Sequence, residues 1–180
     1  MNKLPSSQRY SQVTQFFHWA TAILVLVAFI YGLGGPEQRV YAASRDFDRQ
    51  LHETLGMAVL TITVLRLLWR LFDTRPVPQS MAPWMEMSSK LVQAGLYLLL
   101  FAVPLTAIAG AWLEGHPLTL LAGLQIAPQM AESHDLGVNI SELHTWLGDV
   151  ILWLAGLHAV AALYHHFFLR DGVLKSMLPG

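Results

Sequence analysis

The stretch LHTWLGDVILWLAGLHAVAALYHHFF (143–168) is apolar over almost its whole length. A bilayer core of about 30 Å takes roughly 20 helical residues, so this stretch is long enough to cross it. Sheets with open edges cannot cross lipid, because their backbone groups would lack hydrogen-bond partners. Three further stretches have the same character, and membrane-spanning helices are predicted at about 16–33, 51–72, 87–112 and 143–168. The predicted fold is an all-α integral membrane four-helix bundle, one transmembrane domain over residues 1–180, with a kink expected at Pro104.

The composition agrees with a membrane protein and excludes several other classes. Hydrophobic residues make up 54% of the 180 residues and charged residues 13%, whereas soluble domains carry about 25% charged residues. The net charge of −1 gives no support for nucleic-acid binding. The absence of cysteine excludes disulfides, zinc–thiolate sites, iron–sulfur clusters and covalently attached haem. The polar N-terminal segment is expected to be a cytoplasmic tail and not a signal peptide.

Lysine and arginine are distributed unevenly between the two sides of the predicted bundle. Neither occurs between Leu91 and Leu169. Cytoplasmic flanks carry an excess of these residues, so both termini are expected to face the cytoplasm. The cations on that side are Lys3, Arg9, Arg70, Arg75, Lys90, Arg170 and Lys175, and those on the outer side are Arg39, Arg45 and Arg49.

Four histidines are predicted to form two pairs at two depths. His52 and His144 open their apolar stretches on the outer side, and His18 begins the first stretch on the cytoplasmic side. His158 follows His144 by fourteen residues, about 21 Å along a helix and close to the same helical face. Two neutral imidazoles suit the two axial positions of a haem iron. The sequence therefore predicts two haem b groups, an outer one at His52 and His144 and an inner one at His18 and His158.

Glycines recur beside the outer histidines. Gly56 and Gly148 follow His52 and His144 by four residues, on the same helical face, where a missing side chain leaves room for a flat macrocycle. Small residues at this spacing also serve close helix packing, and a single interfacial histidine can be a structural hydrogen-bond donor. The pairing of four histidines by depth favours the haem interpretation.

Other polar residues leave alternatives open. Arg66 follows His52 by fourteen residues, so its guanidinium either binds a propionate of the inner haem or extends to the cytoplasmic interface. His165 is either an interfacial side chain or a proton carrier at a quinone pocket. His116 and His134 lie in the outer connection and are expected in solvent.

The stretches FFHWATAILVL (16–26), LHETLGMAVLTITVLRLLWRL (51–71) and LHTWLGDVILWLAGLHAVAALYHHFFLRDGVLKSMLP (143–179) resemble the bacterial cytochrome b561 family. The resemblance extends from about Arg9 to Pro179 and is vague in the third helix and in the connection that follows it. It implies two haem b groups bound by the four paired histidines, electron transfer coupled to ubiquinone, and location in the bacterial inner membrane. One branch of this family is superoxide oxidase, which passes electrons from superoxide to ubiquinone.

The outer charges argue against simply adopting the superoxide activity. Arg45 and Arg49 are candidate partners for propionates of the outer haem, but together with Arg39 they face a larger number of acidic residues, and an acidic mouth steers an anion poorly. The main prediction is therefore transmembrane electron transfer linked to the quinone pool. The acidic residues are Glu37, Asp46, Asp48, Glu114, Glu132, Asp135 and Glu142.

Two other functions remain open as alternatives, namely superoxide:ubiquinone oxidoreductase and a haem b membrane-anchor subunit of a separate dehydrogenase. A haem-free structural protein would show no Soret band. A transporter would need discontinuous helices around a polar cavity at the midplane. The expected partners are lipid, a quinone and an unknown electron donor or acceptor on the outer side.

Overall fold

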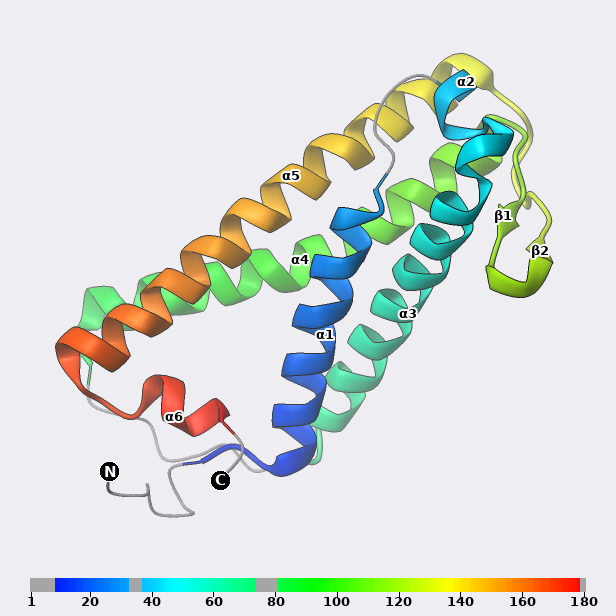
Figure 1. Ribbon diagram of the computed structural model, residues 1–180. Helices are drawn as coiled ribbons and strands as arrows, with labels where there is room; N and C mark the ends of the chain where they lie inside the picture. The colour runs from blue at the N-terminus through cyan, green and yellow to red at the C-terminus, as the bar shows by residue number, and fades with distance from the viewer. Residues whose placement is uncertain (1–8, 33–36, 74–80, 179–180) are drawn as a thin grey trace.

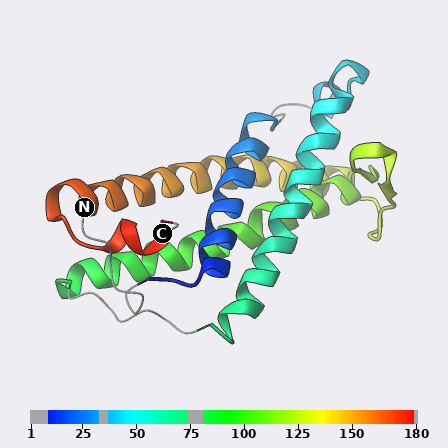
Figure 2. The same cartoon turned by 60° about the horizontal axis from the view of Figure 1, so that its bottom comes forward.

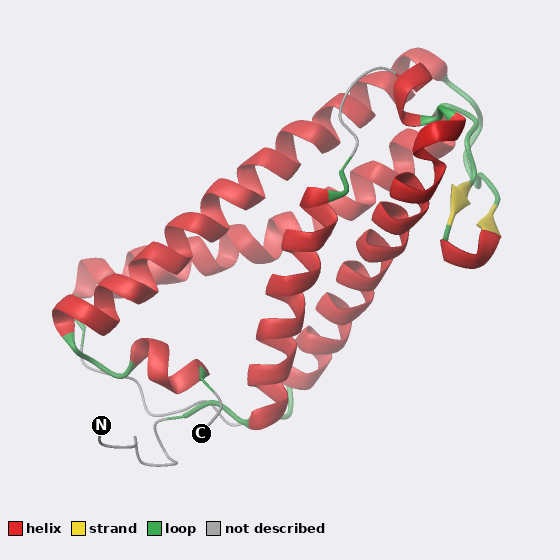
Figure 3. Ribbon diagram, in the orientation of Figure 1, coloured by secondary structure: helices red, strands yellow, loops and turns green. Residues whose placement is uncertain are grey.

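A computed structural model describes residues 9–32, 37–73 and 81–178 (Figure 1). In this part of the chain, four helices are long and apolar enough to cross a membrane. They are α1 (Gln12–Ile30), α3 (Asp46–Arg70), α4 (Pro83–Leu113) and α5 (His134–Tyr164). Helices dominate the molecule, as Figure 3 shows, and the predicted all-α membrane bundle is confirmed.

The remaining elements are short and lie at the two ends of the bundle. Near one end are α2 (Glu37–Val40), η2 (Ala43–Arg45) and an antiparallel hairpin of β1 (Leu118–Thr119) and β2 (Gln125–Ile126), with η3 (Leu121–Gly123) at its turn. At the other end, η4 (His165–Leu169) extends α5 by a π-helical turn and α6 (Val173–Met177) follows. The end that carries the hairpin is called the outer end below, and the opposite end the inner end.

All four long helices begin earlier than the apolar pattern predicted, and α1 begins at Gln12. α3 begins at Asp46, with Asp46 and Asp48 in its first turn, and α5 begins at His134, with Asp135 in its first turn. Carboxylates at these positions favour a helix start because they face the positive end of the helix dipole. α4 begins at Pro83 and runs through Pro104, where a kink was expected, as one continuous helix.

The four long helices form two closely packed pairs. α4 lies along α5 and α1 lies along α3, whereas α1 and α5 share few contacts (Figures 1 and 2). The fully buried core is small and consists of Val59, Leu99, Leu100 and Ile151. The α4–α5 pair depends on a glycine, because a Cβ at Gly110 would lie 2.4 Å from the hydroxyl of Ser141.

At the inner end, the segment around α6 docks against the beginning of α1. The side-chain amide of Gln15 donates to the carbonyl of Ser176 at 3.2 Å, and the indole of Trp19 donates to the carbonyl of Met177 at 2.9 Å. The hydroxyl of Ser11 donates to Asp73, beyond the end of α3, at 3.0 Å. The first and last described segments therefore lie at the same end of the bundle.

Candidate functional site

The four predicted histidines lie in two pairs, one nearer each end of the bundle. The rings of His52 on α3 and His144 on α5 have centroids 6.0 Å apart and planes inclined at 77°. The rings of His18 on α1 and His158 on α5 have centroids 6.2 Å apart and planes inclined at 66°. α5 thus contributes one histidine to each pair, as its helical spacing predicted.

These separations fit a metal ion between the two rings of each pair. Metal–imidazole bonds of roughly 2 Å on opposite sides of one ion place the two ring centroids about 6 Å apart. Among the residues that the structure describes, no group of three or more His, Asp or Glu side chains could hold a metal ion. Two imidazoles at this separation could serve as the two axial ligands of a haem iron.

The outer pair is oriented by backbone carbonyls. Nδ1 of His52 donates to the carbonyl of Ala28 at 2.8 Å, close to the end of α1, where the last carbonyls lack helical partners. Nδ1 of His144 donates to the carbonyl of Val103 at 2.8 Å. A carbonyl can only accept, so each Nδ1 carries the proton and each Nε2 keeps a lone pair. Histidine ligands of metals are commonly held in this way.

A cavity of about 370 Å³ contains the outer pair. Protein interiors are normally close-packed, so a largely apolar space of this size is suited to a bound ligand. Apart from the two histidines and a few other polar side chains, its walls are apolar, and they include Val25, Val59, Leu99, Leu100, Val103 and Ile151.

The two glycines beside the outer histidines face this cavity. Gly56 and Gly148 line it, and a Cβ built on either would meet no atom within 4 Å. This differs from Gly110, where a Cβ would collide with Ser141. Close helix packing therefore accounts for Gly110 but not for Gly56 or Gly148, whose missing side chains leave the cavity open.

Arg66 lies at the level of the inner pair. Its guanidinium sits 5.2 Å from the centroid of the Tyr97 ring and within electrostatic range of both His18 and His158. No ion pair joins Arg66 to a carboxylate among the described residues. A half-buried guanidinium in this position is suited to an anion such as a haem propionate.

His165 lies in the π-helical turn that ends α5. Its Nδ1 is 2.5 Å from a carboxylate oxygen of Asp171, whose other oxygen accepts from the backbone N–H of Val173 at 3.0 Å. The pair connects the end of α5 to the beginning of α6. π-helical turns occur frequently at functional sites.

The sequence profile of the prokaryotic cytochrome b561 family matches residues 9–180. The chain belongs to this family. Membership implies haem b binding, a bacterial membrane location and a role in electron transport, and the paired histidines of this cytochrome b561 family member supply suitable ligands for haem.

Three relatives illustrate the match. The chain is 29% identical to "Cytochrome b561 homolog 2" of Escherichia coli (strain K12) over 172 residues, which cover 95% of this chain and 92% of the relative. It is 28% identical to "Probable superoxide oxidase CybB" of Yersinia pestis over 174 residues, with coverage of 96% and 97%. It is 30% identical to "Cytochrome b562" of Cereibacter sphaeroides over 180 residues, with coverage of 94% of each chain.

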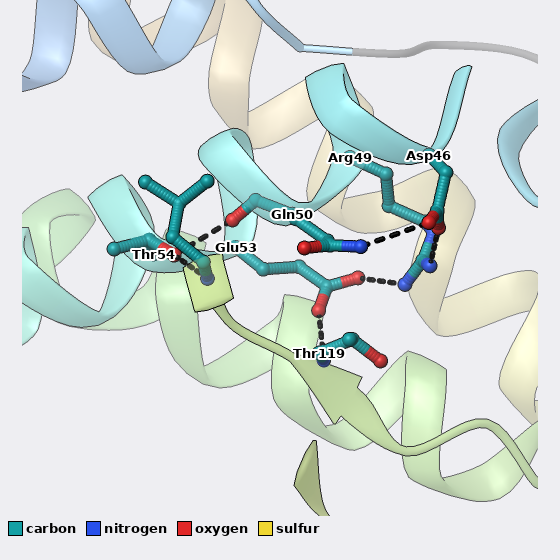
Figure 4. A network of polar contacts seen from close by, with 7 residues as sticks. Asp46, Arg49, Gln50, Glu53, Thr54 and Thr119 are labelled. Carbon is teal, nitrogen blue, oxygen red and sulfur yellow. Dashed lines mark hydrogen bonds and ion pairs between the residues drawn. The ribbon is translucent and has the colours of Figure 1, made fainter. Parts of the chain in front are cut away.

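A polar network next to His52 ties the outer hairpin to α3 in this family member (Figure 4). The carboxylate of Glu53 pairs with Arg49 at 3.0 Å and accepts a hydrogen bond from the backbone N–H of Thr119. The hydroxyl of Thr54 accepts from the backbone N–H of Leu121 at 2.9 Å. Glu53 was not among the predicted site residues, and its only sequence signal was a carboxylate directly after a candidate ligand.

Arg49 and His116 do not lie free at the outer end. Arg49 was expected to bind a propionate, but Asp46 and Glu53 already engage it. His116 was expected in solvent, and this expectation was wrong, because its half-buried ring stacks on Tyr41 with centroids 3.6 Å apart. The sequence could not predict this contact because it joins two different connecting segments.

Asp149 is a second cavity residue that the sequence analysis missed. It lines the cavity on α5, five residues after His144, and its side chain is exposed. The signal was present in the sequence, because an acidic residue inside the apolar stretch 143–168 is by default a functional candidate.

Proposed function

We propose that the protein is a dihaem b-type cytochrome that carries out transmembrane electron transfer linked to the quinone pool. His52 and His144 would hold the outer haem, and His18 and His158 the inner one. The observation that carries this proposal is the presence of two imidazole pairs, with centroids 6.0 and 6.2 Å apart, in a member of the cytochrome b561 family.

The side chains have distinct roles in this proposal. The carbonyls of Ala28 and Val103 fix the rings of His52 and His144, so that each Nε2 points to the iron. The apolar cavity walls exclude water, and Arg66 offsets the charge of a propionate of the inner haem. When bound, haem b supplies one-electron chemistry, which the protein positions and tunes.

We place quinone exchange at the inner end, near His158, His165 and Arg66. Conversion between a quinone and a quinol moves protons as well as electrons, so this end needs groups that hold protons. His165 and Asp171 form such a hydrogen-bonded pair. The excess of cations on the sequences that flank this end supports an inner-membrane topology with both termini in the cytoplasm.

The direct test is anaerobic reduction of the purified protein with candidate donors, followed by addition of ubiquinone while the haem absorption bands are recorded. We expect a Soret band from two haems per chain and oxidation of both by the quinone. The absence of a Soret band would reject a cytochrome function. Reduced haem bands that are unchanged by ubiquinone would reject the link to the quinone pool.

One alternative has support from the relatives. The Yersinia pestis relative is named a probable superoxide oxidase, so superoxide is a candidate outer electron donor. The acidic residues on the outer connections disfavour it, because they repel an anion. A role as the membrane anchor of a separate dehydrogenase would instead be shown by a partner that co-purifies with the chain.

A further inference from the structure

The cavity around His52 and His144 opens toward one side of the bundle. Its lining residues on α3, α4 and the hairpin are buried or half-buried, and Leu118, at the hairpin, is only 5% exposed. The exposed lining residues all belong to α1, to the residues just after it, or to α5. They are Phe29, Gly32, Thr145 and Asp149. The cavity therefore reaches the surface between α1 and α5, which share few contacts.

The network of Glu53 holds the hairpin against α3 beside this cavity. It ties the hairpin to α3 through the backbone N–H of Thr119 (Figure 4). The adjacent Leu118 lines the cavity. The exposed part of the cavity edge therefore lies between α1 and α5, away from the hairpin.

The α5 side of the opening lies at the depth of the lipid tails. Asp149 follows His144 by five residues and precedes His158 by nine, or about 8 Å and 14 Å along the helix axis. It thus lies between the two histidine levels, within the span of α5. A bilayer core of about 30 Å includes this position. Phe29 and Gly32 lie at the outer end of α1, so the opening extends from the outer interface into the hydrocarbon layer at Asp149.

Asp149 needs a hydrogen-bond donor at this depth. No hydrogen bond or ion pair involves its carboxylate within the described part of the chain. A carboxylate in hydrocarbon is costly unless it is paired. Thr145 lies one turn away on the same face, and its hydroxyl donates to the carbonyl of Ser141 at 3.2 Å, which leaves its oxygen able to accept.

We infer that Asp149 and Thr145 bind the head group of a lipid-soluble quinol that enters from the membrane between α1 and α5. A quinol presents two hydroxyl donors on a flat ring with an apolar tail, which matches two acceptors at the edge of an apolar cavity. Phe29, which is 40% exposed, offers an aromatic face on the opposite wall. A phospholipid head group does not match, because it is anionic or zwitterionic and lies at the membrane surface.

This inference rests on the proposed link to the quinone pool and adds a second quinone-class site to it. The inner site near His165 would remain in contact with the inner pair, and the site at Asp149 would serve the outer cavity. The two sites can be distinguished by the peptides that a bound quinol contacts.

The test is photolabelling of the protein, with its haems bound, in phosphatidylcholine nanodiscs. The probe is a short-chain ubiquinol that carries an azide, and unlabelled decylubiquinol serves as competitor. Chymotrypsin is used to map the label, because no Lys or Arg lies between 91 and 169. We expect label within 145–152 and within the facing 25–32. Label confined to 165–171 would overturn the inference while leaving the proposed function intact. If the quinol neither labels the protein nor reduces its haems, both the inference and the proposed function are rejected.

Variants make the test specific. Asp149→Leu removes a charged acceptor, so decylubiquinol should protect 145–152 from labelling at least about tenfold less effectively. Asp149→Asn keeps an amide oxygen and should weaken protection less. Asp135→Asn, the same change on the same helix outside the cavity, should have no effect. If decylubiquinol protects 145–152 in the Asp149→Leu protein as well as it does in the unchanged protein, the inference is overturned.

Assembly of each variant is checked by its Soret band. If Asp149→Leu does not assemble, Thr145→Val provides the decision. The loss of one acceptor should weaken protection severalfold, and unchanged protection would overturn the inference.

Discussion

Nδ1 of His52 donates to the carbonyl of Ala28, near the last turn of α1, at a distance of 2.8 Å. This bond joins a side chain on α3 to a backbone group on α1, and it leaves Nε2 of His52 with a lone pair for a ligand. The end of one helix therefore orients the candidate ligand of the next, which makes the geometry of the outer pair depend on the register of α1 against α3.

The ligand pairs predict a specific pattern of haem loss. His52→Ala and His144→Ala should each lose the outer haem and keep the inner one, whereas His18→Ala and His158→Ala should do the reverse, because each iron loses one axial nitrogen. Haem per chain is measured by pyridine haemochrome assay, and the spin state by electron paramagnetic resonance. A His158→Ala protein with two low-spin haems would contradict the pairing.

The glycines predict a separation between haem binding and folding. Gly148→Leu should fill the cavity and lower the haem content from two to one per chain, with helix content unchanged, because no neighbouring atom obstructs the new side chain. Gly110→Ala should instead destabilise the bundle by about 1–3 kcal/mol through overpacking against Ser141.

Circular dichroism and haem content, measured on both glycine variants during thermal unfolding, check this separation. Gly95→Ala is a control that should destabilise the bundle less than Gly110→Ala, because its Cβ would meet only the end of the Leu154 side chain at 3.1 Å. A Gly148→Leu protein with two haems would show that the macrocycle does not use this space.

The contacts of Glu53 with Arg49 and Thr119 predict that the hairpin becomes more mobile when Glu53 is replaced. Glu53→Ala removes the acceptor for the Thr119 N–H and one partner of Arg49. Hydrogen bonds to charged groups contribute about 1.5–3 kcal/mol, so hydrogen exchange within 118–126 should become faster by one to two orders of magnitude. Arg45→Ala, which breaks only the exposed pair with Asp48, is the control and should leave this exchange unchanged.

The topology predicts opposite behaviour of two reporter fusions. A reporter that works only in the cytoplasm should be active after Gly180, and one that works only outside should be active when inserted near Ser133, as the cation distribution requires. Activity in the reversed pattern would exchange the inner and outer ends without affecting the histidine pairs.

The electrostatics of the outer end predict the salt dependence of any reaction with superoxide. The acidic residues there should make the reaction slow at low ionic strength, and added salt should accelerate it by screening the repulsion. Stopped-flow or pulse-radiolysis rates across a salt series provide the measurement. A reaction that is fast at low salt and slows steeply as salt rises would instead make superoxide oxidase the leading function.

The sequence was sufficient to predict the fold class and the grouping of the histidines. Both depend on regular features of the chain, since apolar length predicts a membrane helix and the 3.6-residue period places His144 and His158 on one face. The start of α5 at His134 was not predicted, because its first turns, HDLGVNISE (134–142), carry polar residues and no continuous apolar signal.

Contacts between distant segments were beyond sequence reasoning. Glu53 reaches Thr119 across 66 positions, and nothing local to either residue indicates the other. The engagement of Arg49 is different, because Asp46 and Glu53 lie three residues before it and four after it. This spacing brings side chains together on any helix, so those ion pairs could have been predicted before any role in propionate binding.

The division of the bundle into the pairs α1–α3 and α4–α5 has a consequence for biogenesis. Each pair can enter the membrane as a unit. Few side chains are buried between the two pairs, among them Val59 and Ile151, so the interface between the pairs is weak when no ligand fills the outer cavity. Haem binding would then complete assembly, because the bound haem would contact both helix pairs and hold them together. In cells starved of haem, the chain should insert into the membrane with its two helix pairs poorly packed against each other. Membrane quality-control proteases should then degrade it faster than the haem-bound protein.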